Sequence, residues 1–205
     1  FGEKTTGVFC SGSSGTLDCD LMDRLPNLKI ISVMGVGYNT VDVAAAKKRG
    51  IMVTNTPGVL TDCVADIGMA LMLAISRGVV IGDDYTRSGD WVKNGTMAYT
   101  TKVSGKRLGI VGFGRIGQAV GKRAEAFDMR VSYQGPNKKD VPNDYYAEPS
   151  ELASNVDFLM LTCPGGPGTE KLVNAEVLEA LGPTGMLINI ARGSVVDERA
   201  LASAL

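Results

Sequence analysis

Short apolar runs alternate with amphipathic stretches along most of the chain. The apolar runs predict strands at residues 7–10, 28–33, 51–53, 108–111, 129–133, 157–161 and 186–190. The stretches between them predict helices at residues 17–25, 41–49, 61–77, 116–127, near 151, 175–181 and from 197 to the last residue. Strands that alternate with helices in this way predict parallel sheets covered by helices on both faces.

Two stretches depart from the simple alternation. The helix at 61–77 is apolar on nearly every side, which predicts burial between layers or between subunits. Segment 83–101 is polar and holds Gly89, Gly95 and the only tryptophan, Trp91, and it predicts a connection. Because the alternation resumes at residue 102, the pattern predicts two α/β units in succession.

Composition narrows the class of protein. The 205 residues carry a net charge of −1, so the basic surface that binds nucleic acid and the polybasic patch that binds membranes are both absent from the sequence. The longest apolar run, 67–75, is far shorter than the roughly 20 residues of a spanning helix. The four cysteines are scattered without a C-x-x-C pair, which argues against a zinc site and favours a reducing compartment such as the cytoplasm.

A glycine motif follows the strand predicted at 108–111. Gly112, Gly114 and Gly117 form G-x-G-x-x-G and open an amphipathic helix, which is the context of a dinucleotide-binding turn. The first glycine permits the tight turn, the second lets a pyrophosphate approach the backbone, and the third lets the helix pack on the strand. The free N–H groups at the helix start would face the phosphates. A glycine turn that binds nothing remains the alternative.

The next strand ends at residue 133 and is followed by Gln134. An acidic residue usually stands there and holds the ribose 2′-hydroxyl, whereas a neutral glutamine does not repel a 2′-phosphate. Asn137, Lys138 and Lys139 follow in the same loop, and the two lysines would balance the phosphate charge. NADPH is therefore favoured and NADH is possible. The alternative is that these lysines belong only to a solvated loop.

Several further motifs, in a fixed order, carry a resemblance. The chain resembles the D-isomer-specific 2-hydroxyacid dehydrogenase family, and within it the glyoxylate/hydroxypyruvate reductases. The resemblance extends over the whole length and rests on GVGYN at 35–39, VD at 41–42, RGI at 49–51, NTPGVLTD at 55–62, VAD at 64–66, TTKVSGK at 100–106 with the glycine motif, CPGG at 163–166, NIARGS at 189–194 and VDE at 196–198.

The resemblance implies a reaction. Members reduce a small 2-keto acid with hydride from a nicotinamide cofactor, and here that would be glyoxylate or hydroxypyruvate. Val36 and Gly37 match the loop whose backbone N–H groups hold the substrate carboxylate. Arg192 matches the catalytic arginine, whose planar fork can bind a carboxylate and polarise a keto oxygen. A simple strand-end turn and a surface arginine paired with Glu198 or Asp197 are the corresponding alternatives.

The resemblance also implies residues around the nucleotide. Arg115 and Ile116 match residues over the pyrophosphate. Cys163, Pro164 and Thr169 match a loop that borders the nucleotide, with Cys163 as a packing residue. The implied fold has two Rossmann- or flavodoxin-like parallel-sheet domains, both incomplete. Residues 1–98 would be part of the substrate-binding (catalytic) domain with a connecting helix, and residues 99–205 part of the dinucleotide-binding domain.

One part of the family's pattern is missing. Members use a glutamate and then a histidine downstream of the arginine, and this sequence contains no histidine. We therefore expect the sequence to be a fragment cut at both ends, with the proton donor outside it. The alternatives are a non-catalytic, nucleotide-sensing protein of the corepressor type and a dehydrogenase of another 2-hydroxy acid. The intact protein is expected to form a homodimer, for which the helix at 61–77 offers an apolar surface.

Overall fold

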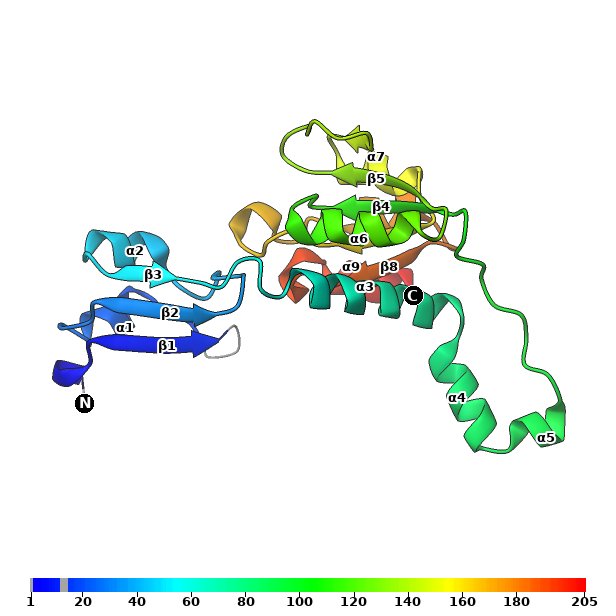
Figure 1. Cartoon of the computed structure of the whole chain (residues 1–205), viewed down its shortest axis with the longest axis horizontal. Coiled ribbons are helices and arrows are strands. Elements are labelled where there is room, and N and C mark those ends of the chain that lie inside the picture. Colours follow the sequence, from blue (N-terminus) through cyan, green and yellow to red (C-terminus); the bar gives the residue numbers. More distant parts are fainter. Residues whose placement is uncertain (1, 12–14) are drawn as a thin grey trace. The chain divides into compact units, whose positions relative to one another are not determined.

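The computed structural model describes residues 2–11 and 15–205 (Figure 1). The chain divides into two compact units, Phe1–Thr61 and Asp62–Leu205. Each unit contains one parallel β-sheet with helices packed on it, so the predicted α/β class is confirmed. The two units are described separately below.

Unit 1 holds a three-stranded parallel sheet in the order β1-β2-β3. Its elements are η1 (Gly2–Lys4), β1 (Gly7–Ser11), α1 (Cys19–Asp23), β2 (Ile30–Met34), α2 (Val43–Lys48) and β3 (Met52–Thr54). Aspartates begin both helices: the carboxylate of Asp18 accepts from the N–H of Leu21, and that of Asp42 from the N–H of Ala45. The predicted strands and helices of this unit are confirmed, with ends that differ by a few residues.

Helices cover only one face of the sheet in unit 1, contrary to the expectation that both faces are covered. Helices α1 and α2 both pack on the face that carries Cys10, Ile31 and Val33. Within the described residues of this unit, the opposite face stays open, and Phe9 and Met52 are 71% and 61% exposed. The prediction failed here because the apolar residues of a strand do not indicate which face of the sheet each connecting helix covers.

Unit 2 holds a five-stranded parallel sheet in the order β6-β5-β4-β7-β8. The strands are β4 (Arg107–Val111), β5 (Arg130–Gln134), β6 (Asp144–Tyr146), β7 (Phe158–Leu161) and β8 (Met186–Asn189). The remaining elements are α3 (Thr61–Ser76), α4 (Val79–Arg87), α5 (Asp90–Asn94), α6 (Arg115–Glu125), α7 (Pro149–Ser154), η2 (Pro167–Thr169), α8 (Ala175–Leu181), η3 (Gly193–Val195) and α9 (Glu198–Ala204).

The sheet of unit 2 is covered on both faces. Helices α3 and α6 bury one face through side chains such as Met69 and Val120, and helices α7, α8 and α9 cover the other face. The chain builds strands outward from β4 in both directions, first through β5 and β6 and then through β7 and β8. In such a doubly wound sheet, ligands bind at the carboxyl ends of the strands where the order reverses. That point lies between β4 and β7.

Helix α3 lies close against this sheet. A Cβ atom at Gly68 would lie 2.9 Å from Cδ1 of Ile190 and 3.1 Å from Sδ of Met160, so a side chain at this position would require these two side chains to shift. The opposite side of α3 is exposed at Ile67 and Ile75, so the helix is half-buried within this unit. Because of this packing, α3 belongs to the second compact unit. The boundary between the substrate-binding and dinucleotide-binding domains, predicted at residues 98/99, stays a prediction.

Segment 83–101, predicted as a connection, contains helical structure that the sequence pattern did not predict. It contains the end of α4 and all of α5, and only residues 88–89 and 95–101 lie outside these helices. Gly78 and Gly89 precede these helices with φ of +58° and +78°, a left-handed conformation that breaks one helix from the next. Neither helix buries a residue, so the amphipathic pattern that reveals a packed helix is missing.

Within the described residues, no single helix is long and apolar enough to cross a membrane, and the bent pair α3 and α4 passes that test only as a pair.

Candidate functional site

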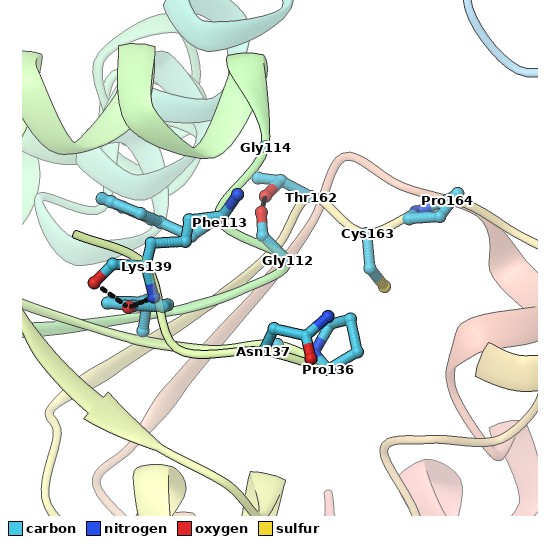
Figure 2. A pocket seen from close by; sticks show the side chains of 11 residues that line it. Gly112, Phe113, Gly114, Pro136, Asn137, Lys139, Thr162, Cys163 and Pro164 are labelled. Carbon is cyan, nitrogen blue, oxygen red and sulfur yellow. Dashed lines mark hydrogen bonds between the residues drawn. The ribbon is translucent and has the colours of Figure 1, made fainter. Parts of the chain in front are cut away.

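A pocket of about 240 Å³ opens at the carboxyl ends of β4, β5 and β7 (Figure 2). Its walls come from the turn after β4, the loop after β5 and the segment after β7. The lining residues are Gly112, Phe113, Gly114, Tyr133, Gly135, Pro136, Asn137, Lys139, Thr162, Cys163 and Pro164. The pocket therefore lies at the reversal point of the doubly wound sheet, where this class of fold binds ligands.

Gly112 makes the first turn possible. Its φ is +91°, and an added Cβ would lie 2.6 Å from the backbone nitrogen of Cys163. Its N–H donates to the carbonyl of Gln134 (2.9 Å), and its carbonyl accepts from the hydroxyl of Thr162. The turn is thus fixed to both neighbouring strand ends, and only glycine fits.

Gly117 and Gly114 have different surroundings. A Cβ at Gly117 would lie 2.5 Å from the carbonyl oxygen of Gly112, so the close approach of α6 to the turn requires glycine. A Cβ at Gly114 would meet no atom within 4 Å and would stand in the open space at the pocket. Gly114 begins the eleven-residue helix α6 without a side-chain cap, which leaves its first N–H groups for an anion. The geometry fits the pyrophosphate of a dinucleotide.

The segment after β7 forms the opposite wall. Cys163 is only 8% exposed, and burial raises the pKa of its thiol, so it remains a neutral packing group at neutral pH. Pro164 lines the pocket beside it. The hydroxyl of Thr169 donates to the carbonyl of Pro164 (2.6 Å) and closes the turn, so Thr169 shapes this wall without lining the pocket.

The remaining predicted nucleotide residues lie outside the pocket lining. Arg115 and Ile116 form the first turn of α6. Gln134 does not point its amide into the pocket, because its Nε2 donates to the carbonyl of Ala147 (3.1 Å). Lys138 is exposed beside the lining residues Asn137 and Lys139.

Sequence reasoning missed five lining residues: Phe113, Tyr133, Gly135, Pro136 and Thr162. The sequence could have indicated Tyr133 and Thr162 as lining residues. Both stand at or just after the carboxyl ends of the strands that flank β4, where ligands bind in this class of fold. The ring of Tyr133 stacks on that of Phe113 with centroids 4.6 Å apart, and both residues line the pocket.

Arg192 follows β8, on the same carboxyl edge of the sheet. The Asn189 side chain holds its turn in two ways: Nδ2 donates to the carbonyl of Arg192, and Oδ1 accepts from the N–H of Ala191, both at 2.9 Å. The guanidinium donates to the carbonyl of Ala191 through Nη1 (2.8 Å), and the residue is exposed. The positive charge of Arg192 is therefore accessible to a ligand bound at the carboxyl edge of the sheet.

Val36 and Gly37 lie in unit 1, in the loop after β2. The loop is held at its start, where the N–H of Gly35 donates to the hydroxyl of Thr56 (3.1 Å), and at Val36, whose carbonyl accepts from Nδ2 of Asn55 (2.8 Å). In the described part of the chain, the N–H groups of Val36 and Gly37 have no intramolecular acceptor. Two adjacent free donors can hold a carboxylate.

The doubly wound sheet and the glycine turn define an α/β protein that binds a dinucleotide. Two sequence models match: D-isomer specific 2-hydroxyacid dehydrogenase, NAD binding domain, over residues 69–205, and the catalytic domain of the same family over residues 4–110. The chain belongs to the D-isomer specific 2-hydroxyacid dehydrogenase family, as its resemblance implied.

Curated relatives and solved structures agree with this family. The chain is 50% identical to hydroxyphenylpyruvate reductase from Plectranthus scutellarioides (99% of this chain, 64% of that protein) and 46% identical to glyoxylate/hydroxypyruvate reductase A from Arabidopsis thaliana (94% and 62%). NADPH-dependent glyoxylate/hydroxypyruvate reductase from Sinorhizobium meliloti, in complex with NADP and malonate, superposes with a TM-score of 0.94 at 41% identity (99% and 63%). The chain thus spans less than two thirds of the length of these relatives.

Proposed function

We propose that the protein is a reductase that transfers hydride from NADPH to glyoxylate or hydroxypyruvate and forms the 2-hydroxy acid. The observation that carries the proposal is the pocket at the switch point, which combines the tight turn at Gly112, the open helix start at Gly114 and a lysine at position 139. A solved relative at 41% identity is named an NADPH-dependent glyoxylate/hydroxypyruvate reductase, which supports the same reaction here.

The chain's own residues would bind the cofactor in distinct ways. The start of α6 would hold the pyrophosphate through backbone N–H groups, and Gly114 would leave room for it. Cys163 and Pro164 would cover the nucleotide on its other side. The bound nicotinamide would supply the hydride.

The substrate would be held by charge and by backbone donors. Arg192 would bind the keto acid and stabilise the negative charge that develops on the keto oxygen. Val36 and Gly37 would donate their N–H groups to the substrate carboxylate. The resemblance assigns the role of proton donor to a histidine, and the 205 residues contain none.

The preference for NADPH rests on the loop after β5. Gln134 brings no negative charge, and its amide is bound to the main chain of Ala147. Asn137 and Lys139 line the pocket, and Lys138 lies between them. Two cations and an amide donor suit a 2′-phosphate, whereas NADH needs only a partner for its 2′-hydroxyl.

A second substrate is hydroxyphenylpyruvate, because the relative that is 50% identical is named for its reduction. Steady-state assays of the complete protein with glyoxylate, hydroxypyruvate and hydroxyphenylpyruvate test the assignment. We expect the highest kcat/KM with hydroxypyruvate or glyoxylate. A preference for hydroxyphenylpyruvate would support the second substrate. Tight NADPH binding without turnover of any of the three would support a nucleotide-sensing role.

We also propose a cytoplasmic homodimer. The outer side of α3 and the adjoining α4 expose apolar residues, with Val80 and Ile81 each 68% exposed. Exposed apolar side chains of this kind fit contact with a second copy of the same chain. The free, exposed thiols of Cys19 and Cys63 fit a reducing compartment.

A further inference from the structure

The loop that would meet the 2′-phosphate has little structure of its own. Residues 135–139 follow β5 without helix or strand, and four of the five line the pocket. If nothing held such a loop, it would lose conformational freedom on binding a ligand, and this loss would weaken the binding. Its selectivity therefore depends on what holds it in place.

Tyrosine hydroxyls hold both ends of this loop. The hydroxyl of Tyr145, on β6, donates to the carbonyl of Gly135 at a distance of 3.1 Å. The N–H of Lys139 donates to the hydroxyl of Tyr133 (2.7 Å), and this hydroxyl lies 3.4 Å from the carbonyl of Lys139. Figure 2 shows the bond at Lys139 as a dashed line. The loop is therefore closed at its first and last residues.

Packing of the aromatic rings holds the two tyrosine hydroxyls in position. Tyr133 is fully buried and stacks on Phe113, which stands between the first two glycines of the turn. The ring of Tyr145 lies against that of Tyr133, with centroids 5.4 Å apart. The loop is thus coupled through three aromatic rings to the turn that would hold the pyrophosphate. Its position relative to that turn is set by packing.

We infer that the hydroxyls of Tyr133 and Tyr145 are specificity-determining groups: they position the loop at 135–139 so that Asn137 and the lysines receive the 2′-phosphate of NADPH. Both are positioning residues, since they act through the loop. The inference rests on the proposed preference for NADPH. It predicts that loss of either hydroxyl weakens the binding of NADPH and leaves that of NADH nearly unchanged, because NADH has no 2′-phosphate for the loop to hold.

The test measures the dissociation constants of NADPH and NADH from the fluorescence of the bound nicotinamide, in wild type, Tyr133→Phe and Tyr145→Phe. Tyr146→Phe is the matched control, because it removes a neighbouring tyrosine hydroxyl that forms no hydrogen bond among the described residues. We expect each of the first two variants to lower the NADPH-over-NADH preference by about 5- to 10-fold, the effect of one lost hydrogen bond. The control should keep the wild-type preference.

Two results separate this inference from the cofactor proposal on which it rests. A wild type that prefers NADPH, with both variants keeping that preference, overturns the role of the hydroxyls alone. A wild type that binds the two nucleotides equally, or neither, overturns the cofactor proposal and this inference with it. Tyr145→Phe also guards against a folding defect, because Tyr145 is partly exposed whereas Tyr133 is fully buried.

Discussion

Gly112 and Cys163 are in contact through their backbones. A Cβ atom on Gly112 would lie 2.6 Å from both the nitrogen and the Cα of Cys163, closer than any side chain can approach. The two residues follow β4 and β7, which are neighbours in the sheet. A side chain at residue 112 would therefore displace this wall of the pocket.

Replacing Gly112 with alanine should destabilise unit 2 and prevent nucleotide binding. The positive φ alone costs about 1–3 kcal/mol for a residue with a Cβ, and the clash with Cys163 adds to this. Thermal unfolding followed by circular dichroism, together with NADPH titration, measures both effects.

Gly114→Ala is the matched control for that variant. Its methyl group would meet open space and its φ is −78°, so the melting temperature should stay close to that of the wild type. NADPH affinity should nevertheless fall, because the methyl group stands at the pocket. Unchanged NADPH affinity in this variant would contradict the placement of the pyrophosphate at the start of α6.

Arg192→Ala in the complete protein should reduce kcat/KM for hydroxypyruvate by about 100- to 1,000-fold, the effect of removing one group that stabilises a developing oxyanion. The dissociation constant of NADPH should stay near its wild-type value. Arg199→Ala, on the exposed side of α9, is the control and should keep full activity. Equal turnover by the Arg192 variant and the wild type would show that Arg192 has no part in the reaction.

Asp157→Asn should lower stability at neutral pH and have less effect in acid. Three donors of Arg107 bind the Asp157 carboxylate at 2.8–3.2 Å, and these bonds lower the pKa of Asp157. A carboxyl group whose pKa is lower in the folded state stabilises the fold above its unfolded pKa, and the effect disappears as pH falls through the folded value. We therefore expect a loss of about 1 kcal/mol at pH 7 that shrinks below about pH 4.

Chemical denaturation at several pH values measures that difference. Asp83→Asn is the control, because Asp83 pairs with Arg87 on an exposed helix surface where ion pairs contribute little. A difference between wild type and Asp157→Asn that stayed constant from pH 7 to pH 3 would show that the carboxylate charge is not its source.

Val80→Glu and Ile81→Glu should convert the proposed dimer into monomers. Both side chains are exposed on α4, so a charge there should not disturb the fold of the subunit. In an interface, however, each glutamate would bury an unpaired charge. Sedimentation velocity measures the result, with the exposed, polar substitution Asp84→Ser as the control. Dimers that persist in both glutamate variants would exclude α4 from the contact.

The sequence predicted the parts of the fold that carry a strong pattern. Alternating apolar strands and amphipathic helices indicated both sheets, and the glycine spacing indicated the turn at Gly112. Helices α4 and α5 were missed, because neither buries a residue and apolar periodicity arises from burial. The short strand β6 was missed because its residues 144–146, Asp-Tyr-Tyr, follow a polar loop without an apolar run.

The sequence indicated the glycine turn of the candidate site and several of the residues that line the pocket, but not the contacts between their side chains. Glycines reveal a turn through its steric demands, so Gly112, Gly114 and Gly117 could be assigned from spacing. For Tyr133 the only signal was its place near the end of a strand, because its contacts with Phe113 and Lys139 depend on how β5 lies beside β4. Gln134 seemed free to face the nucleotide, but the pairing of β5 with β6 turns its amide toward Ala147.

The most direct test of the central claim is the rate at which the complete protein oxidises NADPH in the presence of hydroxypyruvate or glyoxylate. The account predicts keto-acid-dependent oxidation that is faster with NADPH than with NADH at equal concentration. NADPH that binds but is not oxidised with either keto acid would contradict it.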